Sequence, residues 1–485
     1  MMGQPYREDL TATTPEPHVP RVHRSWWLEE ALAADPGAPC PPLRGRIDAE
    51  VLIVGGGYTG MWTAYHLTER RPDLDIVLVE QDVCGGGPSG RNGGFVNGWW
   101  EGLEVWAERF GDADAMELGL TAARSVAAIP AFCARHGIDA WWTDAPELAV
   151  STSPFHDGAW RPAIETAERL GVGDVFEELS PEAVRGICDS PTFRGGVLTA
   201  DTGTVQPARL ARGLRRVLLE RGVRIFEGTA IRRLEAGPPA VATSDAGSVR
   251  AREVVLGINA WAGTWPRYRR NLAVRGSYIV MTEPAPERLA EIGWTGGNPI
   301  RDLRSSLHYL RTTPDGRIAL GAAAISPSSG ARIGPAYDHD EGALRIALRG
   351  LHRMFPSFRD VPIAAGWGGP IDVAPLYLPF FHTWDAGNVH AALGFTGNGV
   401  GPCHLAGNVL AERVLHEEGL FSRLAVARYA PPSFPPEPVK SVGMRVVNAA
   451  IRRIDDLAEE GKRPGLLTRL VGRAPRLLGY TLGPD

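Results

Sequence analysis

The sequence contains few lysines and cysteines, and it has no long apolar run. Only Lys440 and Lys462 are lysines among 51 basic residues, and the net charge of -5 gives no general attraction to nucleic acid. No two cysteines have the C-x-x-C spacing, so neither a disulfide framework nor a zinc site is expected. The five cysteines are Cys40, Cys84, Cys133, Cys188 and Cys403.

No apolar stretch has the length needed to cross a bilayer, and the first twenty residues are polar and proline-rich rather than basic and then apolar. We therefore expect neither a membrane span nor a secretory signal. Together with the scattered cysteines, this predicts a cytoplasmic protein. A chain of 485 residues is expected to form two or three domains.

The stretch 51–60 is the feature around which the rest of the chain is organised. Its four leading apolar residues predict a buried parallel strand, and glycines follow at the spacing G-x-G-x-x-G. A helix is predicted over 61–70 with its N-terminal amides toward phosphates, and a second strand ends at Glu80, where a carboxylate can hold a ribose diol. The unit predicts a dinucleotide site, with NAD and FAD both open. Its glycines are Gly55, Gly57 and Gly60.

Two further glycine-rich loops occur far apart in the chain. One directly follows the strand that ends at Glu80, and the other precedes a helix with Pro402 in its first turn. We expect two such loops in one protein when each of them holds one end of the same ligand. The alternative for each is a surface loop or a tight turn without a ligand. The first loop contains Gly87, Ser89, Gly90, Arg91, Asn92, Gly93 and Gly94, and the second contains Gly397, Asn398, Gly399 and Val400.

The order of predicted elements indicates an α/β fold: a discontinuous Rossmann-type nucleotide domain, an inserted, mostly antiparallel α+β substrate domain, and a helical C-terminal tail. The arm 1–45 is expected to be irregular apart from a short helix opened by Ser25. The other predicted ranges are 46–100, 185–265 and 360–425 for the nucleotide domain, 101–184 and 266–359 for the substrate or cap domain, and 426–485 for linker and tail.

The segment 266–360 has the alternation of antiparallel strands, and 341–354 has the pattern of an amphipathic helix. A strand predicted over 305–311 would put Arg304, Ser306 and His308 on one face. The tail carries nine basic and six acidic residues between 431 and 485. Its predicted helix is expected to pack on the body or on a second subunit, as in a homodimer, with membrane-surface contact as the alternative.

With these loops placed, the chain resembles the D-amino-acid oxidase-like family of FAD-dependent oxidoreductases, which includes glycine and sarcosine oxidases. Within it the resemblance points to the γ-glutamylputrescine oxidoreductase-like branch and covers about 46–425. The motifs that carry it are Ser89-Gly-Arg-Asn-Gly-Gly-Phe95, Val205-Gln-Pro207, Arg275-Gly276, Trp367-Gly-Gly-Pro-Ile-Asp372 and Gly394-Phe-Thr-Gly-Asn-Gly-Val-Gly401.

The resemblance implies FAD as cofactor. It implies that the first glycine unit, with Tyr58 and Thr59, contacts the pyrophosphate. It also implies that Glu80 contacts the adenosine ribose and that the backbone near Ala230 contacts the adenine. The loop 87–94 would pass the pyrophosphate and the flavin ring. The segment 397–400 would lie at the pyrimidine edge of that ring, where a helix dipole stabilises negative charge.

The family's reaction moves a hydride from the α-carbon of an amine to flavin N5, and water hydrolyses the imine. The substrate implied is a small amine or amino acid, with the many arginines favouring an anionic group on it. An FAD-linked 2-hydroxy-acid dehydrogenase and a catalytically weak flavin-binding protein that recruits a partner are the alternatives. Candidates for substrate binding or proton handling are His308, Tyr309, Arg304, Arg311, Tyr278 and Trp367.

Two departures from the family matter for the chemistry. Some relatives activate oxygen with a lysine near the flavin, but both lysines here lie outside the resemblance, which favours a dehydrogenase with another acceptor over an oxidase. Some relatives attach flavin through a cysteine on the strand that here contains Ser305 to Tyr309, without cysteine. Non-covalent FAD is therefore expected. Cys403 is expected to be a semi-buried structural cysteine rather than an acidified thiol.

Overall fold

The computed structural model describes residues 19–324, 332–477 and 479–480. The first part of the expected N-terminal arm, 1–18, therefore lies outside the described residues. The arm's expected helix is α1 (Trp26–Ala34): the hydroxyl of Ser25 accepts a hydrogen bond from the amide of Leu28 at 3.1 Å. The helix buries Trp27 completely, which fixes the arm against the body of the protein.

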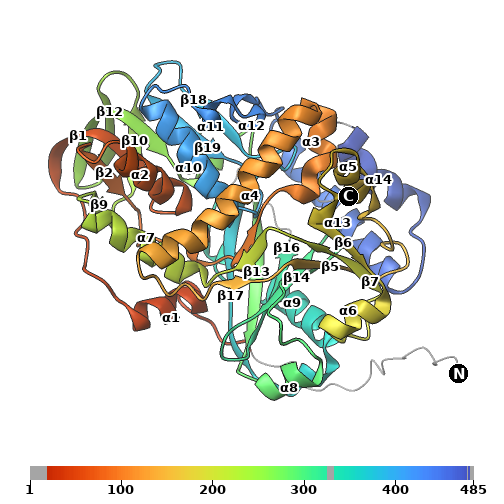
Figure 1. Cartoon of the computed structure of the whole chain (residues 1–485). Coiled ribbons are helices and arrows are strands. Elements are labelled where there is room, and N and C mark those ends of the chain that lie inside the picture. The colour runs from red at the N-terminus through yellow and green to blue at the C-terminus, as the bar shows by residue number, and fades with distance from the viewer. Residues whose placement is uncertain (1–18, 325–331, 478, 481–485) are drawn as a thin grey trace, which may run out of the picture.

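A twisted α/β sheet forms one half of the molecule (Figure 1). Its central strands β19, β12, β1, β2 and β9 are parallel, and a hairpin of β10 and β11 extends it on β12. The runs 51–54 and 76–79 are wholly buried, as continuous apolar parallel strands require. The strands are β10 (Ile231–Glu235), β11 (Ala240–Ser244), β12 (Gly247–Leu256), β1 (Gly45–Val54), β2 (Ile76–Val79), β9 (Arg224–Phe226), β19 (Val389–Leu393) and β18 (Phe380–Thr383).

Helices cover this first sheet and share one core with it. The predicted helix after the glycine turn is α2, which begins three residues earlier than the pattern indicated. The helix that follows the second glycine-rich loop is α10. Gly407 of α10 lets the two helices touch, because a Cβ there would lie 2.8 Å from the backbone of Trp62. The helices are α2 (Tyr58–Arg70), α3 (Leu103–Phe110), α4 (Asp112–Arg135), α7 (Pro207–Glu220), α10 (Val400–Val414), α11 (Leu420–Arg423) and α12 (Ala425–Arg428).

A second sheet forms the other half and is antiparallel except where β14 pairs with β5. The amphipathic helix expected over 341–354 is α9 (Glu341–Met354), which packs its apolar side on one face of this sheet. In order across the sheet the strands are β17 (Ile363–Val373), β13 (Ala273–Thr282), β16 (Ile318–Ala324), β15 (His308–Thr312), β14 (Ile300–Asp302), β5 (Glu147–Ser151), β7 (Gly195–Thr199) and β6 (Phe176–Leu179).

Smaller elements complete the body. Strands β3 (Phe95–Asn97), β8 (Thr202–Thr204) and β4 (Thr143–Asp144) form a third sheet beside the first glycine-rich loop. The short helices of the second half are α5 (Arg161–Arg169), α6 (Pro181–Ile187) and α8 (Pro286–Glu291), and the tail forms α13 (Val439–Glu459) and α14 (Leu466–Leu477). Among the described residues, no helix combines the length and apolarity that crossing a membrane requires.

The α/β fold with an antiparallel second part and a helical tail is confirmed, but several elements lie elsewhere than the predicted ranges put them. Strands β7 and β17, in ranges assigned to the nucleotide domain, pair within the second sheet. Helix α4, in a range assigned to the cap, buries Leu118, Val126 and Ile129 in the core of the first sheet. The apolar pattern of an element shows which of its residues are buried, but it does not show which of the two cores buries them.

The strand predicted over 305–311 is wrong at its start, since β15 begins only at His308. The amides of Ser305 and Ser306 donate to the carboxylate of Asp455 in the tail, at 3.3 and 2.8 Å, instead of to a neighbouring strand. Arg304 and Ser306 are therefore in a loop held by the tail, and they do not share a strand face with His308. Nothing near 304 in the sequence signals this, because the acceptor is 149 residues away from Ser306.

Candidate functional site

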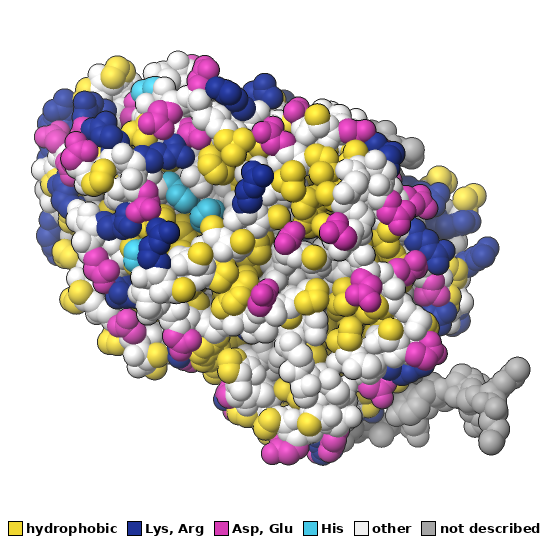
Figure 2. Space-filling model, viewed as in Figure 1, with side chains coloured by type: hydrophobic (Ala, Val, Ile, Leu, Met, Phe, Trp, Pro, Cys, Tyr) yellow, Lys and Arg dark blue, Asp and Glu magenta, His cyan; other side chains and the backbone are white. Residues whose placement is uncertain are grey.

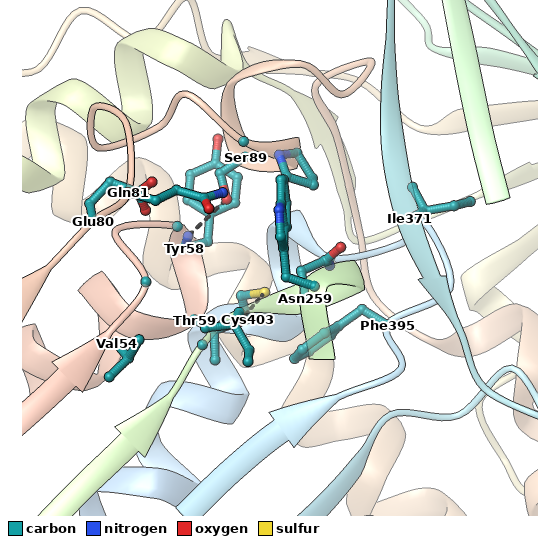
Figure 3. A pocket seen from close by; sticks show the side chains of 18 of the residues that line it. Val54, Tyr58, Thr59, Glu80, Gln81, Ser89, Asn259, Ile371, Phe395 and Cys403 are labelled. Carbon is teal, nitrogen blue, oxygen red and sulfur yellow. Dashed lines mark hydrogen bonds between the residues drawn. The ribbon is translucent and has the colours of Figure 1, made fainter. Parts of the chain in front are cut away.

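The candidate site is a pocket at the carboxyl ends of β1 and β2, closed from the other side by the segments before α10 and after β12. Figure 3 shows side chains from these segments converging on it. The pocket follows the rule that open α/β sheets bind ligands beyond the carboxyl ends of their strands. Twelve predicted cofactor residues line it: Gly55, Gly57, Tyr58, Thr59, Glu80, Gly87, Ser89, Asn92, Ala230, Gly397, Gly399 and Val400.

The first glycine turn is shaped by close backbone contacts. Gly55 has a φ of +110°, and a Cβ on it would lie 2.4 Å from the carbonyl oxygen of Gly257. A Cβ on Gly60 would lie 2.1 Å from the carbonyl oxygen of Gly55, so Gly60 is needed for packing although it does not line the pocket. At Gly57 a Cβ would meet only the hydroxyl of Ser89, at 3.0 Å, on the open side of the turn.

The N-termini of α2 and α10 both open on the pocket. Their capping positions are glycines, Gly57 and Gly399, and within the described chain neither helix has a side-chain cap. One amide of α2 is occupied, since that of Tyr58 donates to the hydroxyl of Ser89 at 2.8 Å (Figure 3). Uncapped helix N-termini present free N–H groups and a positive dipole end, which suits a phosphate or a developing anion.

Glu80 lies at the end of β2 and lines the pocket, as predicted. Its carboxylate accepts hydrogen bonds from the amides of Gly56 at 2.7 Å and Asp82 at 2.9 Å. Burial raises the pKa of Glu80 to about 7, and the two amides oppose that shift. A carboxylate accepts about four hydrogen bonds, so two positions remain for the hydroxyls of a ribose.

The loop 87–94 is held by its own side chains. The amide nitrogen of Asn92 donates to the carbonyls of Pro88 and Ser89, both at 3.0 Å, while its oxygen accepts from the amide of Gly94 at 2.7 Å. Arg91 does not line the pocket: it donates to the carbonyl of Gly86 and pairs with a carboxylate beside the second sheet. Also outside the pocket lining are Gly90, Gly93, Gly94 and Asn398.

Residues after β12 also line the pocket, and the sequence patterns did not point to them. Asn259, with a φ of +43°, donates from its side chain to Asp372 of β17 at 3.1 Å. Asp372 in turn accepts a hydrogen bond from the amide of Gly394, so this buried carboxylate links the segment after β12 to the second glycine-rich loop. The apolar run at the end of β12 was the available signal, because the carboxyl end of that strand lies beside that of β1. The missed lining residues are Gly257, Ile258, Asn259, Trp261, Thr264 and Trp265.

None of the six predicted substrate-site residues lines this pocket, and they lie on different sides of the second sheet. His308 faces α9: its Nδ1 is 2.7 Å from Asp302, and a Cβ on Gly350 would lie 2.6 Å from its Nε2. Tyr278 is on that side too, where its hydroxyl donates to the carbonyl of Ala336 at 2.6 Å. These two residues are therefore separated by the sheet from the face that meets the glycine-rich loop.

Tyr309 faces the glycine-rich loop. Its ring packs against Gly93 and Phe95, and its hydroxyl lies 2.8 Å from the hydroxyl of Ser277. Burial raises the pKa of Tyr309 to about 12. Because residues alternate along a strand, Ser277 and Arg275 share this face of β13, and Tyr309 and Arg275 are thus brought to one surface.

The other predicted substrate residues have structural partners. Trp367 donates from its ring nitrogen to the carbonyl of Arg91 at 2.9 Å. Arg311 donates to the carbonyl of Val205, and burial lowers its pKa to about 9. Arg304 pairs with Glu459 of the tail at 2.6 Å. These contacts hold the loop, the second sheet and the tail together.

Arg275 is a buried cation with unused donors beside the pocket, and in the sequence it stands out only as part of the motif Arg275-Gly276. It pairs in register with Ile371, which lines the pocket, and one guanidinium nitrogen donates to the hydroxyl of Tyr377 at 3.1 Å. Its Nε and Nη2 are buried without a hydrogen-bond partner among the described residues, and the residue is 8% exposed. A buried guanidinium with two free N–H groups is suited to a carboxylate or another oxyanion.

The fold and the glycine-framed pocket define a dinucleotide-dependent oxidoreductase, and comparison gives the family. The family model for FAD dependent oxidoreductases matches residues 50–413, and the chain belongs to that family. FAD is accordingly its cofactor. The pocket fits this group, because two uncapped helix N-termini and an acid at the end of β2 stand where a long, phosphate-containing ligand needs them.

The chain is similar to the gamma-glutamylputrescine oxidoreductase of Escherichia coli (strain K12), with 29% identity over 81% of this chain and 90% of that protein. Among solved structures it resembles glycine oxidase from Geobacillus kaustophilus, with a TM-score of 0.65, 19% identity and coverage of 79% and 99%. It also resembles L-proline dehydrogenase from P. horikoshii, with a TM-score of 0.63, 19% identity and coverage of 79% and 96%. The two structures establish the shared fold.

Proposed function

We propose that the protein oxidises the carbon–nitrogen bond of a small amine or amino acid that carries an anionic group. The amine is supported by what its relatives are named for: gamma-glutamylputrescine, glycine and L-proline. The anionic group is supported by the free, buried guanidinium of Arg275 beside the pocket. Bound FAD supplies the hydride acceptor at N5, and the oxidised substrate leaves as an imine that water hydrolyses.

We propose that the pocket residues hold FAD from its adenine to its ring. The N-terminus of α2 at Gly57 takes the pyrophosphate, Glu80 the adenosine ribose and the backbone near Ala230 the adenine. Ser89 and its loop run along the pyrophosphate and ring, and the N-terminus of α10 at Gly399 meets the pyrimidine edge. The support is that all five residues line one pocket. The positive end of the α10 dipole favours electron density arriving at that edge.

The attachment of FAD is proposed to be non-covalent. The pocket lining includes one cysteine, Cys403, whose sulfur lies 3.2 Å from the hydroxyl of Thr59 (Figure 3). Burial raises the pKa of this thiol to about 12, so it is protonated at neutral pH and is a poor nucleophile. This supports the expectation of a structural cysteine.

The substrate is proposed to bind on the face of the second sheet that presents Arg275, Ser277 and Tyr309. Arg275 would hold the anionic group, and the hydroxyls of Ser277 and Tyr309 would orient the amine by hydrogen bonds. With its pKa raised, Tyr309 stays protonated at neutral pH and does not serve as a base. The amine therefore has to react as the neutral form, because only that form has the lone pair that assists loss of the hydride.

The electron acceptor is proposed to be a carrier other than oxygen. Lys440 donates its ammonium hydrogens to the carbonyls of Arg269 and Leu272, and Lys462 is exposed beside Glu460. Neither lysine lines the pocket, so the lysine that activates oxygen in some relatives has no counterpart there. Slow oxygen consumption and fast reduction of an artificial acceptor are expected in the same preparation.

Product analysis tests the proposed reaction. The holoenzyme is incubated with an artificial electron acceptor and with matched amines and 2-hydroxy acids, with and without a carboxylate. The proposal predicts that anionic amines yield a carbonyl compound and a released amine or ammonia. Turnover of hydroxy acids alone would assign the protein to carbon–oxygen oxidation instead. No turnover of either set would favour a flavin-binding protein without this activity.

A further inference from the structure

The helical tail has an inner face that is fully engaged with the body. In α13, the carboxylate of Asp455 is 1% exposed and accepts from the backbone of Ser306, and Glu459 pairs with Arg304. The carbonyl of Ala458 accepts from the hydroxyl of Ser153 at 2.9 Å. Helix α13 is thus fixed to the body by its inner face, and the exposure of its outer face does not result from loose packing of the helix.

The outer side of the tail exposes large apolar side chains. Val439, Val442 and Val446 form an i, i+3, i+7 stripe on α13, each more than half exposed. On α14, Leu466 and Leu467 are 67% and 76% exposed. Leaving such residues in water is unfavourable, and exposed large apolar side chains on both helices of the tail mark an interaction surface.

Helix α14 lies against α13 and turns its leucines outward. Gly472 allows the close approach, since a Cβ there would lie 2.7 Å from Ile454 of α13, and Pro475 is buried. Leu470, on the same helix as Leu466 and Leu467, is 52% exposed. The helix therefore packs Gly472 against α13, while its leucines remain exposed on the surface.

Helix α14 and the turn just before it carry charged side chains of one sign. Residues 462–477 contain five basic side chains and no acidic one, and all five are exposed. In Figure 2 basic and hydrophobic side chains lie together at the right-hand edge, where Figure 1 places α14. The basic residues are Lys462, Arg463, Arg469, Arg473 and Arg476.

We propose that α14 and the exposed stripe of α13 form a docking surface for an anionic lipid bilayer. A helix with leucines on one side and arginines around them lies in the plane of a membrane, with the leucines among acyl chains and the arginines at anionic headgroups. A nucleic acid would satisfy the arginines but would offer no apolar environment to Leu466 and Leu467. A second copy of this chain would bring the arginines of the two α14 helices together across a two-fold axis, which is repulsive.

Vesicle sedimentation with the full-length holoenzyme tests this surface. We expect binding to vesicles of phosphatidylcholine mixed with phosphatidylglycerol, little binding to phosphatidylcholine alone, and weakening by salt. Each basic residue at such a surface contributes about fivefold to partitioning. The variant R469E/R473E is therefore expected to lose at least about tenfold. The variant L466S/L467S/L470S, which removes the apolar contact, is expected to fall at least as far.

The matched control is R44E/R46E, which makes the same change in net charge at exposed residues of the body. It should bind like the unaltered protein, and all variants should keep the bound flavin spectrum and the thermal midpoint. Equal binding by R469E/R473E and the control, or no binding to anionic vesicles, would overturn the proposal. So would a concentration-dependent dimer that the leucine variant abolishes, because the surface would then serve the homodimer expected from the sequence.

Discussion

Replacing Arg275 by methionine is expected to separate substrate recognition from folding. The buried guanidinium has two N–H groups without partners among the described residues, so in the proposed complex it forms two charge-assisted hydrogen bonds to the substrate's anionic group. Such bonds contribute roughly 1.5 to 3 kcal/mol each. Because they are not additive, we expect a loss of about 3 kcal/mol, which corresponds to about 150-fold in kcat/KM.

The assay compares two amines that differ only in a carboxylate. R275M is expected to reduce kcat/KM for the amine with a carboxylate by about 150-fold and to change that for the amine without one by less than about threefold, since only the former uses the guanidinium. R275K should recover part of the loss, because lysine keeps the charge but not the two-pronged geometry. Equal losses for both amines would refute the assignment of Arg275 to the anionic group.

Arg301 supplies the stability control. It is also buried, but it pairs with Glu147 at 2.6 Å and with Glu101 at 2.6 Å. R301M leaves Glu147 buried without its cation and is expected to destabilise the protein by about 3 kcal/mol or more. R275M removes a buried charge that has no carboxylate partner, so the thermal midpoint without substrate should be unchanged or higher. A drop in midpoint like that of R301M would mean that Arg275 is structural.

Three further outcomes follow from the geometry. G60A places a Cβ 2.1 Å from the carbonyl of Gly55 and should weaken FAD binding at least about tenfold, measured by flavin release. Because burial raises the pKa of Glu80 from 4.5 to about 7, the FAD-free protein should lose stability as the pH rises through that interval; since Asp372 titrates over a similar interval, E80Q should make this loss smaller in melts at stepped pH. D455N weakens the hold on Ser306 and should lower stability by about 2 kcal/mol in denaturant titrations. An unchanged value in any of these measurements would contradict the corresponding contact.

The nucleotide half could be predicted because its signals are local. The apolar run 51–54, the glycine spacing and the acid at 80 all lie within one strand, turn, helix and strand, and each is required by the backbone there. The helix over 341–354 was equally clear, because its apolar residues repeat along one face. Eight of the twelve predicted residues that line the pocket lie between 55 and 92, whereas Ala230, Gly397, Gly399 and Val400 are distant in sequence and their roles were implied by the family resemblance.

The substrate side could not be predicted because its determinants are distant in sequence. Whether His308 or Tyr309 faces the cofactor half depends on how β15 pairs with β16 and on which face of that sheet α9 covers. Arg275 is distinguished by two guanidinium nitrogens beside the pocket that are unpartnered within the described part of the chain, which is a property of the packed molecule and not of the sequence around it. The choice of core by β17 and α4 is likewise tertiary, since their apolar faces fit either half.

The central claim is that the flavin is reduced by the carbon–nitrogen bond of an anionic amine. The most direct measurement is rapid anaerobic mixing of the holoenzyme with amines, amino acids and 2-hydroxy acids, followed by the visible flavin absorbance. The account predicts bleaching by amines or amino acids with a carboxylate, and no bleaching by the hydroxy acids. Bleaching by hydroxy acids with none by any amine would contradict it.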